Sequence, residues 1–264
     1  MKKIRVHDIE LAYDDAGSGS AVVLLHGYPF NRSMWNEQTE VLRKSHRVIV
    51  PDLRGHGDSQ VAPATIKDMA RDIAELMTGL GINEAVIGGL SMGGYIALAF
   101  YRQFPERVKA LMLADTRAAA DTDEVRQNRK KQAERALSEG MEAIANDLLP
   151  KVLSAETIAK RSDIVERVRR MIVNTRPEGA AAALKAMGER EDQSSLLPLI
   201  AVPTLILVGR DDTITPVKEA DSMHREIQGS VLEVIEGAAH LSNLEQPEQF
   251  NRGMGGFLRN ADRG

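Results

Sequence analysis

A serine between two glycines is the strongest chemical signal in this chain of 264 residues. Gly89-Leu90-Ser91-Met92-Gly93 follows an apolar run at 85–87 and opens a stretch of helical pattern. On a tight turn from strand to helix, a side chain at either glycine would collide with neighbouring backbone. Ser91 is therefore the predicted nucleophile, and the alternative is an ordinary turn serine. The backbone N–H of Met92, at the helix start, would face negative charge developing beside Ser91.

A serine hydroxyl is a poor nucleophile unless a base removes its proton and a carboxylate orients that base. After such a turn, the acid and then the histidine are each expected on a loop that follows a later strand. His240 follows the apolar run 231–235, so it is the predicted base. Asp211 and Asp212 follow the run 204–208, and their spacing does not decide which of them is the acid. Either could instead be a solvated loop carboxylate or a helix cap.

The composition argues against other kinds of reactive centre. The chain has no cysteine, which excludes disulfides, thiol nucleophiles, zinc fingers and iron–sulfur ligation. None of its six histidines has the spacing of a metal site. His26 and His56 lie in glycine-flanked turns, where a ring can hydrogen-bond the loop backbone. We therefore expect no metal site and no cofactor.

The elements that must position these residues alternate between strands and helices. Six runs are apolar at nearly every position, which fits strands buried on both faces of a parallel sheet. They lie at 21–25, 48–50, 85–87, 108–114, 204–208 and 231–235. Residues 3–15 alternate instead and predict an antiparallel hairpin, whereas Ile66 to Leu80 carries an apolar stripe at helical spacing. The pattern predicts an α/β fold with right-handed crossovers.

This alternation is interrupted once, between residues 117 and 192. The segment has no strand-like run, its charges nearly balance, and its apolar residues recur at helical spacing. We expect three to five amphipathic helices here. The predicted division is a core made of 1–116 and 193–264, with 117–192 as an inserted helical cap. The alternative is an elaborate crossover with no gating role.

Charge and hydropathy exclude several classes of protein. The chain has 34 Lys and Arg against 38 Asp and Glu, a net charge of −4, which excludes a strongly basic nucleic-acid binder. Charged residues interrupt the apolar residues of the N-terminal segment, which argues against a signal peptide. No uncharged stretch is long enough to span a membrane. We expect a soluble, cytoplasmic protein with a small-molecule substrate. Its oligomeric state is left open.

Aromatic residues are absent from position 105 to position 249, a range that covers the whole predicted cap. A roof formed by the cap would then be aliphatic and bear Met141, Met171 and Met187, which favours small or aliphatic acyl groups. The candidate pocket residues are Phe30, Trp35, Tyr95 and Met141. The alternatives are that Tyr95 packs in a helical core and that Phe30 and Trp35 anchor a loop.

Five motifs in this order resemble the α/β-hydrolase fold superfamily, over the whole chain apart from the insert. They are His26-Gly27-Tyr28-Pro29, Asp52 to Ser59, Gly89 to Gly94, Gly209 to Pro216 and the His240 loop. The resemblance implies a mostly parallel central sheet flanked by helices, with a helical cap inserted between two strands. The family's G-x-x-D-x-x-x-P pattern places its aspartate at Asp212. Its oxyanion donors correspond to the backbone N–H groups of Tyr28 and Met92.

Residues 239–247 look like the histidine loop of 3-oxoadipate enol-lactonases and related small carboxylesterases. The loop at 26–29 instead resembles general esterases and the epoxide hydrolase and haloalkane dehalogenase branch, whose aspartate nucleophile is replaced here by Ser91. The resemblance implies a serine hydrolase that cleaves carboxylic esters or lactones through an acyl-enzyme, without a cofactor. The alternatives are C–C bond hydrolysis, thioester hydrolysis or perhydrolysis on the same residues, and a ligand-binding receptor on this scaffold.

Overall fold

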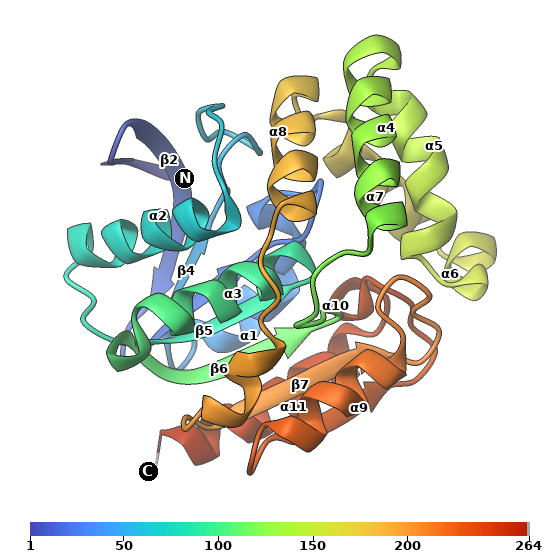
Figure 1. The fold of residues 1–264 in the computed structure, drawn as a ribbon. Helices are drawn as coiled ribbons and strands as arrows, with labels where there is room; N and C mark the ends of the chain where they lie inside the picture. The colour runs from blue at the N-terminus through green and yellow to red at the C-terminus, as the bar shows by residue number, and fades with distance from the viewer. Residues whose placement is uncertain (263–264) are drawn as a thin grey trace.

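The computed structural model describes residues 1–262 and is built around one eight-stranded sheet (Figure 1). Its strands are β1 (Lys2–Val6), β2 (Ile9–Gly17), β3 (Ala21–Leu25), β4 (Arg47–Pro51), β5 (Ala85–Leu90), β6 (Val108–Ala114), β7 (Thr204–Gly209) and β8 (Val231–Ile235). Their order across the sheet is β1-β2-β4-β3-β5-β6-β7-β8. The β1–β2 and β2–β4 pairs are antiparallel and all other pairs are parallel, so the predicted hairpin and the predicted parallel sheet are both confirmed.

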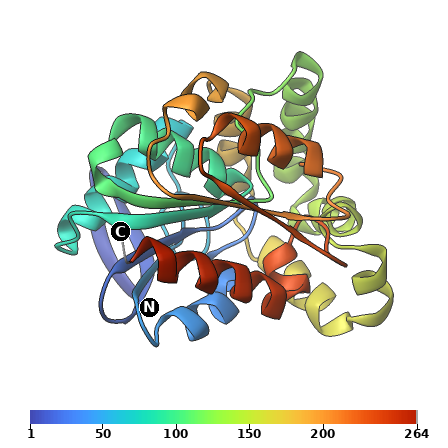
Figure 2. The ribbon, with the colours of Figure 1, turned by 90° about the horizontal axis from the view of Figure 1, so that it is seen from below.

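Helices cover both faces of the sheet, because its central strands are apolar on both sides. One face packs against α2 (Ile66–Gly79), α3 (Met92–Gln103) and α9 (Val217–Glu226). The other packs against α1 (Asn36–Leu42) and α11 (Pro247–Ala261). Figure 2 shows α11 and α9 on opposite sides of the strands. The shorter helical turns are η1 (Arg32–Trp35), η2 (Pro105–Arg107), η3 (Ser194–Leu199) and α10 (Ser242–Glu245).

Helix α2 shows how local sequence sets an element's bounds. Thr65 accepts a hydrogen bond from the Asp68 N–H, and the Asp68 carboxylate accepts one from the Thr65 N–H, which closes a capping box at the helix start. The apolar stripe predicted for this helix is buried against the sheet. The burial of one face, together with the cap, accounts for a helix in this place.

Five α-helices lie between β6 and β7. They are α4 (Asp123–Glu139), α5 (Met141–Val152), α6 (Ala155–Lys160), α7 (Ser162–Val173) and α8 (Pro177–Gly188). Helix α4 packs against α8, and α5 packs against α7. Figure 1 shows the group at one end of the sheet, beyond the tip of β6. We refer to these helices, with their flanking segments 117–122 and 189–192, as the cap.

The two ends of the cap are held together. The buried carboxylate of Asp121 pairs with Arg190 at 2.7 Å and also binds Arg129. The Arg190 guanidinium donates to the Ala119 carbonyl, and the Gln193 N–H donates to the Ala118 carbonyl. Entry and exit of the insert therefore form one hydrogen-bonded unit. Across residues 1–262, no helix is long and apolar enough to cross a membrane.

Candidate active site

Ser91 lies on the turn between β5 and α3, in a backbone conformation with φ 55° and ψ −114°. A Cβ atom at Gly89 would lie 2.1 Å from the Gly93 carbonyl oxygen, and one at Gly93 would lie 2.2 Å from the Leu25 carbonyl oxygen. Both glycines are therefore required by close backbone contact, as their spacing predicts. Positive φ at a non-glycine residue costs conformational energy, which the surrounding packing must offset.

The structure brings Asp212, and not Asp211, to His240. The Asp212 Oδ2 atom accepts a hydrogen bond from His240 Nδ1 at 2.8 Å and another from the Thr215 hydroxyl at 2.6 Å. Its Oδ1 atom accepts from the backbone N–H groups of Ile214 and Thr215. Asp211 is exposed instead. The spacing left these two neighbours open, because adjacent residues in a loop point in different directions that only the folded loop defines.

Hydrogen bonding keeps Asp212 ionised although its side chain is buried. Burial alone would raise the pKa of this carboxyl, but the charge and hydrogen bond of His240 and the bonds from Thr215 hold the pKa below its usual value. The carboxylate therefore accepts a hydrogen bond from the Nδ1–H of His240, and this tautomer leaves Nε2 free to accept a proton.

Ser91 and His240 line the same cleft, which has a volume of about 500 Å³. No hydrogen bond links the Ser91 hydroxyl to another side chain in residues 1–262, and such contacts are often long until substrate is bound. The cleft lies between the carboxyl ends of the central strands and the cap. Its core side is lined by Tyr28, Ser91, Tyr95, Ile214 and His240.

The loop that contains Tyr28 lies directly beside Ser91. A Cβ atom at Gly27 would lie 3.4 Å from Ser91 Cβ. Within residues 1–262, the Tyr28 N–H donates to no other backbone group, and Met92, as the first residue of α3, has no preceding helical carbonyl to bond. Two free N–H donors thus flank the serine, which is the arrangement that the α/β-hydrolase resemblance implies.

Two buried histidines next to this loop, His26 and His56, form hydrogen bonds with loop backbone groups, as their glycine-flanked positions predict. His26 bonds the Gly27 carbonyl through Nδ1 and accepts the Leu53 N–H at Nε2, both at 2.9 Å. His56 bonds the Arg54 carbonyl and packs edge-on against His26, with ring centres 5.0 Å apart. Burial lowers the pKa of His26 to about 4 and that of His56 to about 3. Both rings are therefore neutral parts of the loop framework at neutral pH.

Of the four predicted pocket residues, only Tyr95 reaches the cleft. Phe30 and Trp35 are fully buried in the core on the α1 and α11 face, where the Trp35 ring lies 6.0 Å from that of Phe250. Met141 is buried inside the cap. The expectation for these three residues does not hold, because their large apolar side chains are needed to fill the core and the cap interior.

The cap side of the cleft combines aliphatic side chains (Val125, Leu148, Val152 and Met187) with a group of basic ones. Of the three methionines expected in the roof, only Met187 lines the cleft. Five cationic side chains line it as well: Arg117, Arg129, Lys131, Arg135 and Lys151. The one acidic residue in the lining, Asp147, is paired with Arg135. Helix α4 explains the difference, since Ala136 is its only fully buried residue and its charged side chains therefore face the cleft as well as solvent.

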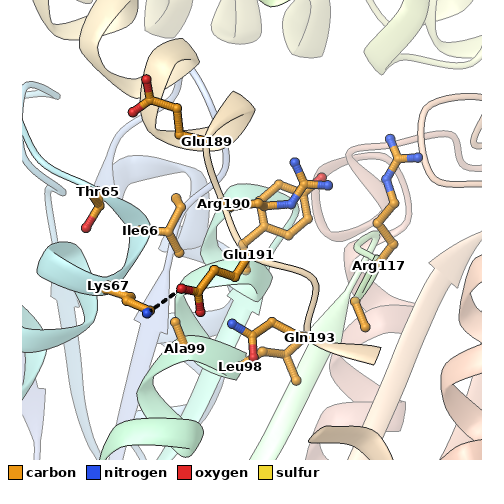
Figure 3. A pocket seen from close by; sticks show the side chains of 12 residues that line it. Thr65, Ile66, Lys67, Leu98, Ala99, Arg117, Glu189, Arg190, Glu191 and Gln193 are labelled. Carbon is orange, nitrogen blue, oxygen red and sulfur yellow. Dashed lines mark hydrogen bonds and ion pairs between the residues drawn. The ribbon is translucent and has the colours of Figure 1, made fainter. Parts of the chain in front are cut away.

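A second hollow of about 240 Å³ is lined by Lys67, Arg190 and Glu191, among other residues (Figure 3). It shares Tyr95 and Arg117 with the cleft. The Arg190 guanidinium carbon lies 4.1 Å from the centre of the Tyr95 ring, and an ion pair joins Lys67 to Glu191 across the hollow. Tyr95 thus lines both cavities, and Arg190, from the exit segment of the cap, packs over its ring. No cluster of side chains in the described part of the chain has the make-up of a metal site.

Comparison with known proteins identifies the class to which this fold and site belong. The family model of the alpha/beta hydrolase fold matches residues 20–247, and the chain belongs to this family. The resemblance inferred from the motifs is therefore confirmed, as is the predicted fold class.

Within the family, the chain is similar to enol-lactonases and esterases. It is 30% identical to 3-oxoadipate enol-lactonase 2 of Acinetobacter baylyi, over 97% of this chain and 96% of that protein. A malate-bound thermophilic esterase from Thermogutta terrifontis superposes with a TM-score of 0.96 at 43% identity, over 99% of both chains. The enol-lactonase of Burkholderia xenovorans superposes with a TM-score of 0.92 at 30% identity, over 98% of this chain and 100% of the other.

Proposed function

We propose that the protein hydrolyses carboxylic esters or lactones, with Ser91 as nucleophile, His240 as base and Asp212 as the orienting acid. The observation that carries this proposal is the buried Asp212–His240 pair, joined at 2.8 Å, in a cleft that also contains Ser91 on its strained turn. The names of the similar proteins support the same chemistry, since hydrolysis of an ester and of a lactone breaks the same kind of acyl–oxygen bond.

In the proposed reaction, His240 Nε2 takes the proton of Ser91 as Oγ attacks the carbonyl carbon of the substrate. The N–H groups of Tyr28 and Met92 stabilise the resulting oxyanion. His240 then donates its proton to the leaving alcohol, which leaves an acyl group on Ser91. Water, activated by His240, attacks this acyl-enzyme and releases the acid. Asp212 stabilises the imidazolium that forms twice in the cycle. No step requires a cofactor.

The basic residues that line the cleft favour a negatively charged substrate. Lys131 and Lys151 have no acidic partner in residues 1–262, and both side chains line the cleft. Unpaired cations attract an anionic ligand and increase the rate at which it is captured. Esters or lactones that carry a second, negatively charged group are therefore favoured over plain aliphatic acyl esters. This adds charge recognition to the expectation of an aliphatic roof, of which only Met187 among the three methionines lines the cleft.

The division of the chain into core and cap, its partners and its cellular location belong to the same proposal. Residues 1–116 and 193–264 would form the catalytic core, and residues 117–192 would form the roof over a small-molecule substrate. Neither a nucleic acid nor a membrane takes part in this function, and a cytoplasmic location is consistent with it.

The test is hydrolysis of p-nitrophenyl esters and of an enol-lactone, combined with labelling by a fluorophosphonate. We expect sustained turnover and labelling by the wild type, and loss of both in Ser91→Ala. Absence of turnover together with absence of labelling in the folded wild type would overturn the proposal. A single burst of product without further turnover would instead indicate a ligand-binding receptor.

A further inference from the structure

A second buried carboxyl lies close to the proposed catalytic pair. Asp115 directly follows β6, and its side chain is fully buried. Its Oδ1 atom accepts the Gly209 N–H at 2.8 Å, and its Oδ2 atom lies 2.5 Å from the Ser242 hydroxyl. No lysine, arginine or histidine pairs with it anywhere in residues 1–262. The reaction proposed above makes no use of this group.

The two partners of Asp115 belong to the two loops that supply the acid and the base. Gly209 ends β7 and begins the loop that contains Asp212. Ser242 lies two residues after His240, at the start of α10. One carboxyl group therefore joins the loop that carries Asp212 to the loop that carries His240. Asp115 has φ 43°, and packing must hold this unfavourable conformation.

The residues on either side of Asp115 hold the serine turn in the same way. The Ala114 carbonyl accepts the Ser91 N–H at 2.9 Å. The Thr116 hydroxyl donates to the Ser91 carbonyl at 2.8 Å. Three consecutive residues thus contact all three loops that carry Ser91, Asp212 and His240.

The surroundings of Asp115 favour its neutral form. Burial is the largest cause, and the negative charges of Asp212 and Glu245 add to it, so that the pKa of Asp115 is raised well above its usual value. The hydrogen bonds from Ser242 and Gly209 act in the opposite direction but are outweighed. The carboxyl proton then lies in the short contact with Ser242. An ionised Asp115 would instead place a second negative charge beside Asp212.

We propose that Asp115 is a positioning residue: a buried carboxyl group that ties the acid loop to the histidine loop and so sets His240 against Asp212. The consequence for hydrolysis rests on the proposed function, but the effect on His240 does not. An asparagine can reproduce both contacts, since its amide oxygen accepts from Gly209 and its amide nitrogen donates to Ser242. A leucine fills similar space and makes neither contact.

The experiment compares Asp115→Asn, Asp115→Leu and Asp211→Asn, the last as a control that removes an exposed carboxyl from the same loop. The Nδ1 proton of His240 is followed by proton NMR and identified by its loss in His240→Gln. We expect Asp115→Asn to retain this resonance and Asp115→Leu to shift or broaden it. Loss of the hydrogen bonds that orient a reacting group commonly lowers activity by about 10- to 100-fold, and we expect Asp115→Leu to lose kcat by this factor with little change in KM.

The pH profile of kcat/KM tests whether Asp115 is neutral or ionised. If Asp115 is neutral, Asp115→Asn leaves the acidic limb in place and keeps kcat within about threefold of the wild type. An acidic limb displaced to lower pH in Asp115→Asn would show that Asp115 is ionised, because removal of a nearby negative charge lowers the pKa of a histidine. That result would overturn the neutral form.

Unchanged kcat and an unchanged His240 resonance in Asp115→Leu would overturn the positioning role. If Asp115→Leu does not fold, as judged by circular dichroism, Ser242→Ala replaces it. That variant removes only the contact to the histidine loop, and we expect a smaller loss of kcat, about 2- to 10-fold, with a shifted resonance. A wild type without hydrolysis or labelling would contradict the proposed function alone, and the NMR comparison would still decide the role of Asp115.

Discussion

The carboxylate of Glu245 joins the histidine loop to the cap, since it accepts the Ala239 N–H at 2.7 Å and the Ser154 N–H at 2.8 Å. Ala239 directly precedes His240, and Ser154 is the N-cap of α6. A second link, from the Leu241 N–H to the Val152 carbonyl, lies beside it. The base of the proposed reaction is therefore attached to the cap on one side and to the sheet on the other.

We predict that Glu245→Gln destabilises this junction. A carboxamide has one acceptor oxygen, so one of the two N–H groups would face an amide NH₂ in a buried site. Loss of a charged hydrogen bond of this kind costs about 2 kcal/mol. The expected result is a lower free energy of unfolding in urea and faster hydrogen exchange at the Ala239 and Ser154 amides. Glu248→Gln, an exposed position on α11, is the control. Equal exchange rates in both variants would contradict the prediction.

The assignment of the acid is tested by the adjacent pair of aspartates. Asp212→Asn keeps the shape of the side chain but removes the charge that orients His240, and loss of the orienting acid in such centres lowers kcat by about 10⁴-fold. We expect a loss of this order for Asp212→Asn and a kcat within about twofold of the wild type for Asp211→Asn, since exposed substitutions have small effects. Comparable losses in the two variants would refute the choice of Asp212.

The buried histidines predict a loss of stability toward acid pH. Burial lowers the pKa of His56 in the folded protein to about 3, whereas the unfolded chain titrates near 6.5. As the pH falls below 6.5, the unfolded state takes up the proton first, so the folded state loses about 1.4 kcal/mol per pH unit for this ring. The same holds for His26 down to about pH 4.

The measurement is the free energy of unfolding at several pH values between 7 and 4.5, for the wild type and for His56→Gln. We expect the difference between the two to shrink as the pH falls, because the variant lacks one titrating group. His224→Gln is the control, because it changes a half-buried histidine of α9 that lies outside the loop at 26–29, and its curve should run parallel to that of the wild type. Parallel curves for His56→Gln and the wild type would contradict the prediction.

The basic cleft predicts a dependence on substrate charge and on salt. In solvent, a pair of unit charges about 4 Å apart contributes about 1 kcal/mol, so Lys131→Gln and Lys151→Gln should each raise KM for an anionic ester about 2- to 5-fold. The comparison uses p-nitrophenyl acetate and its analogue with a terminal carboxylate. KM for the anionic ester should rise with ionic strength, and KM for the neutral ester should stay constant. An equal effect of either substitution on both esters would rule out charge recognition.

Local sequence was enough for the serine turn and for most of the sheet. Gly89 and Gly93 could be read as obligatory, because the clash they avoid lies within a few residues of Ser91 and in the strand that pairs with β5. The strands were predictable for a similar reason, since burial on both faces leaves a continuous apolar run in each of them. The order of serine, acid and histidine along the chain then placed His240 on its loop.

Only the tertiary structure decided which side chains face the cleft. Asp211 and Asp212 have the same chemistry, and spacing alone does not separate them. The family pattern favours Asp212, but the direction of its side chain is shown only by the hydrogen bonds that its Oδ1 atom accepts from the N–H groups of Ile214 and Thr215. Phe30 and Trp35 follow the loop that contains Tyr28 in the sequence, but their side chains turn into the core. The sequence does not show that charged residues of α4 line the cleft, because hydropathy does not distinguish a helix face toward solvent from a face toward a polar cleft. No sequence pattern marks Asp115 as a positioning residue. Its side chain contacts Gly209 and Ser242, which lie far from it in the chain and come close to it only in the folded protein.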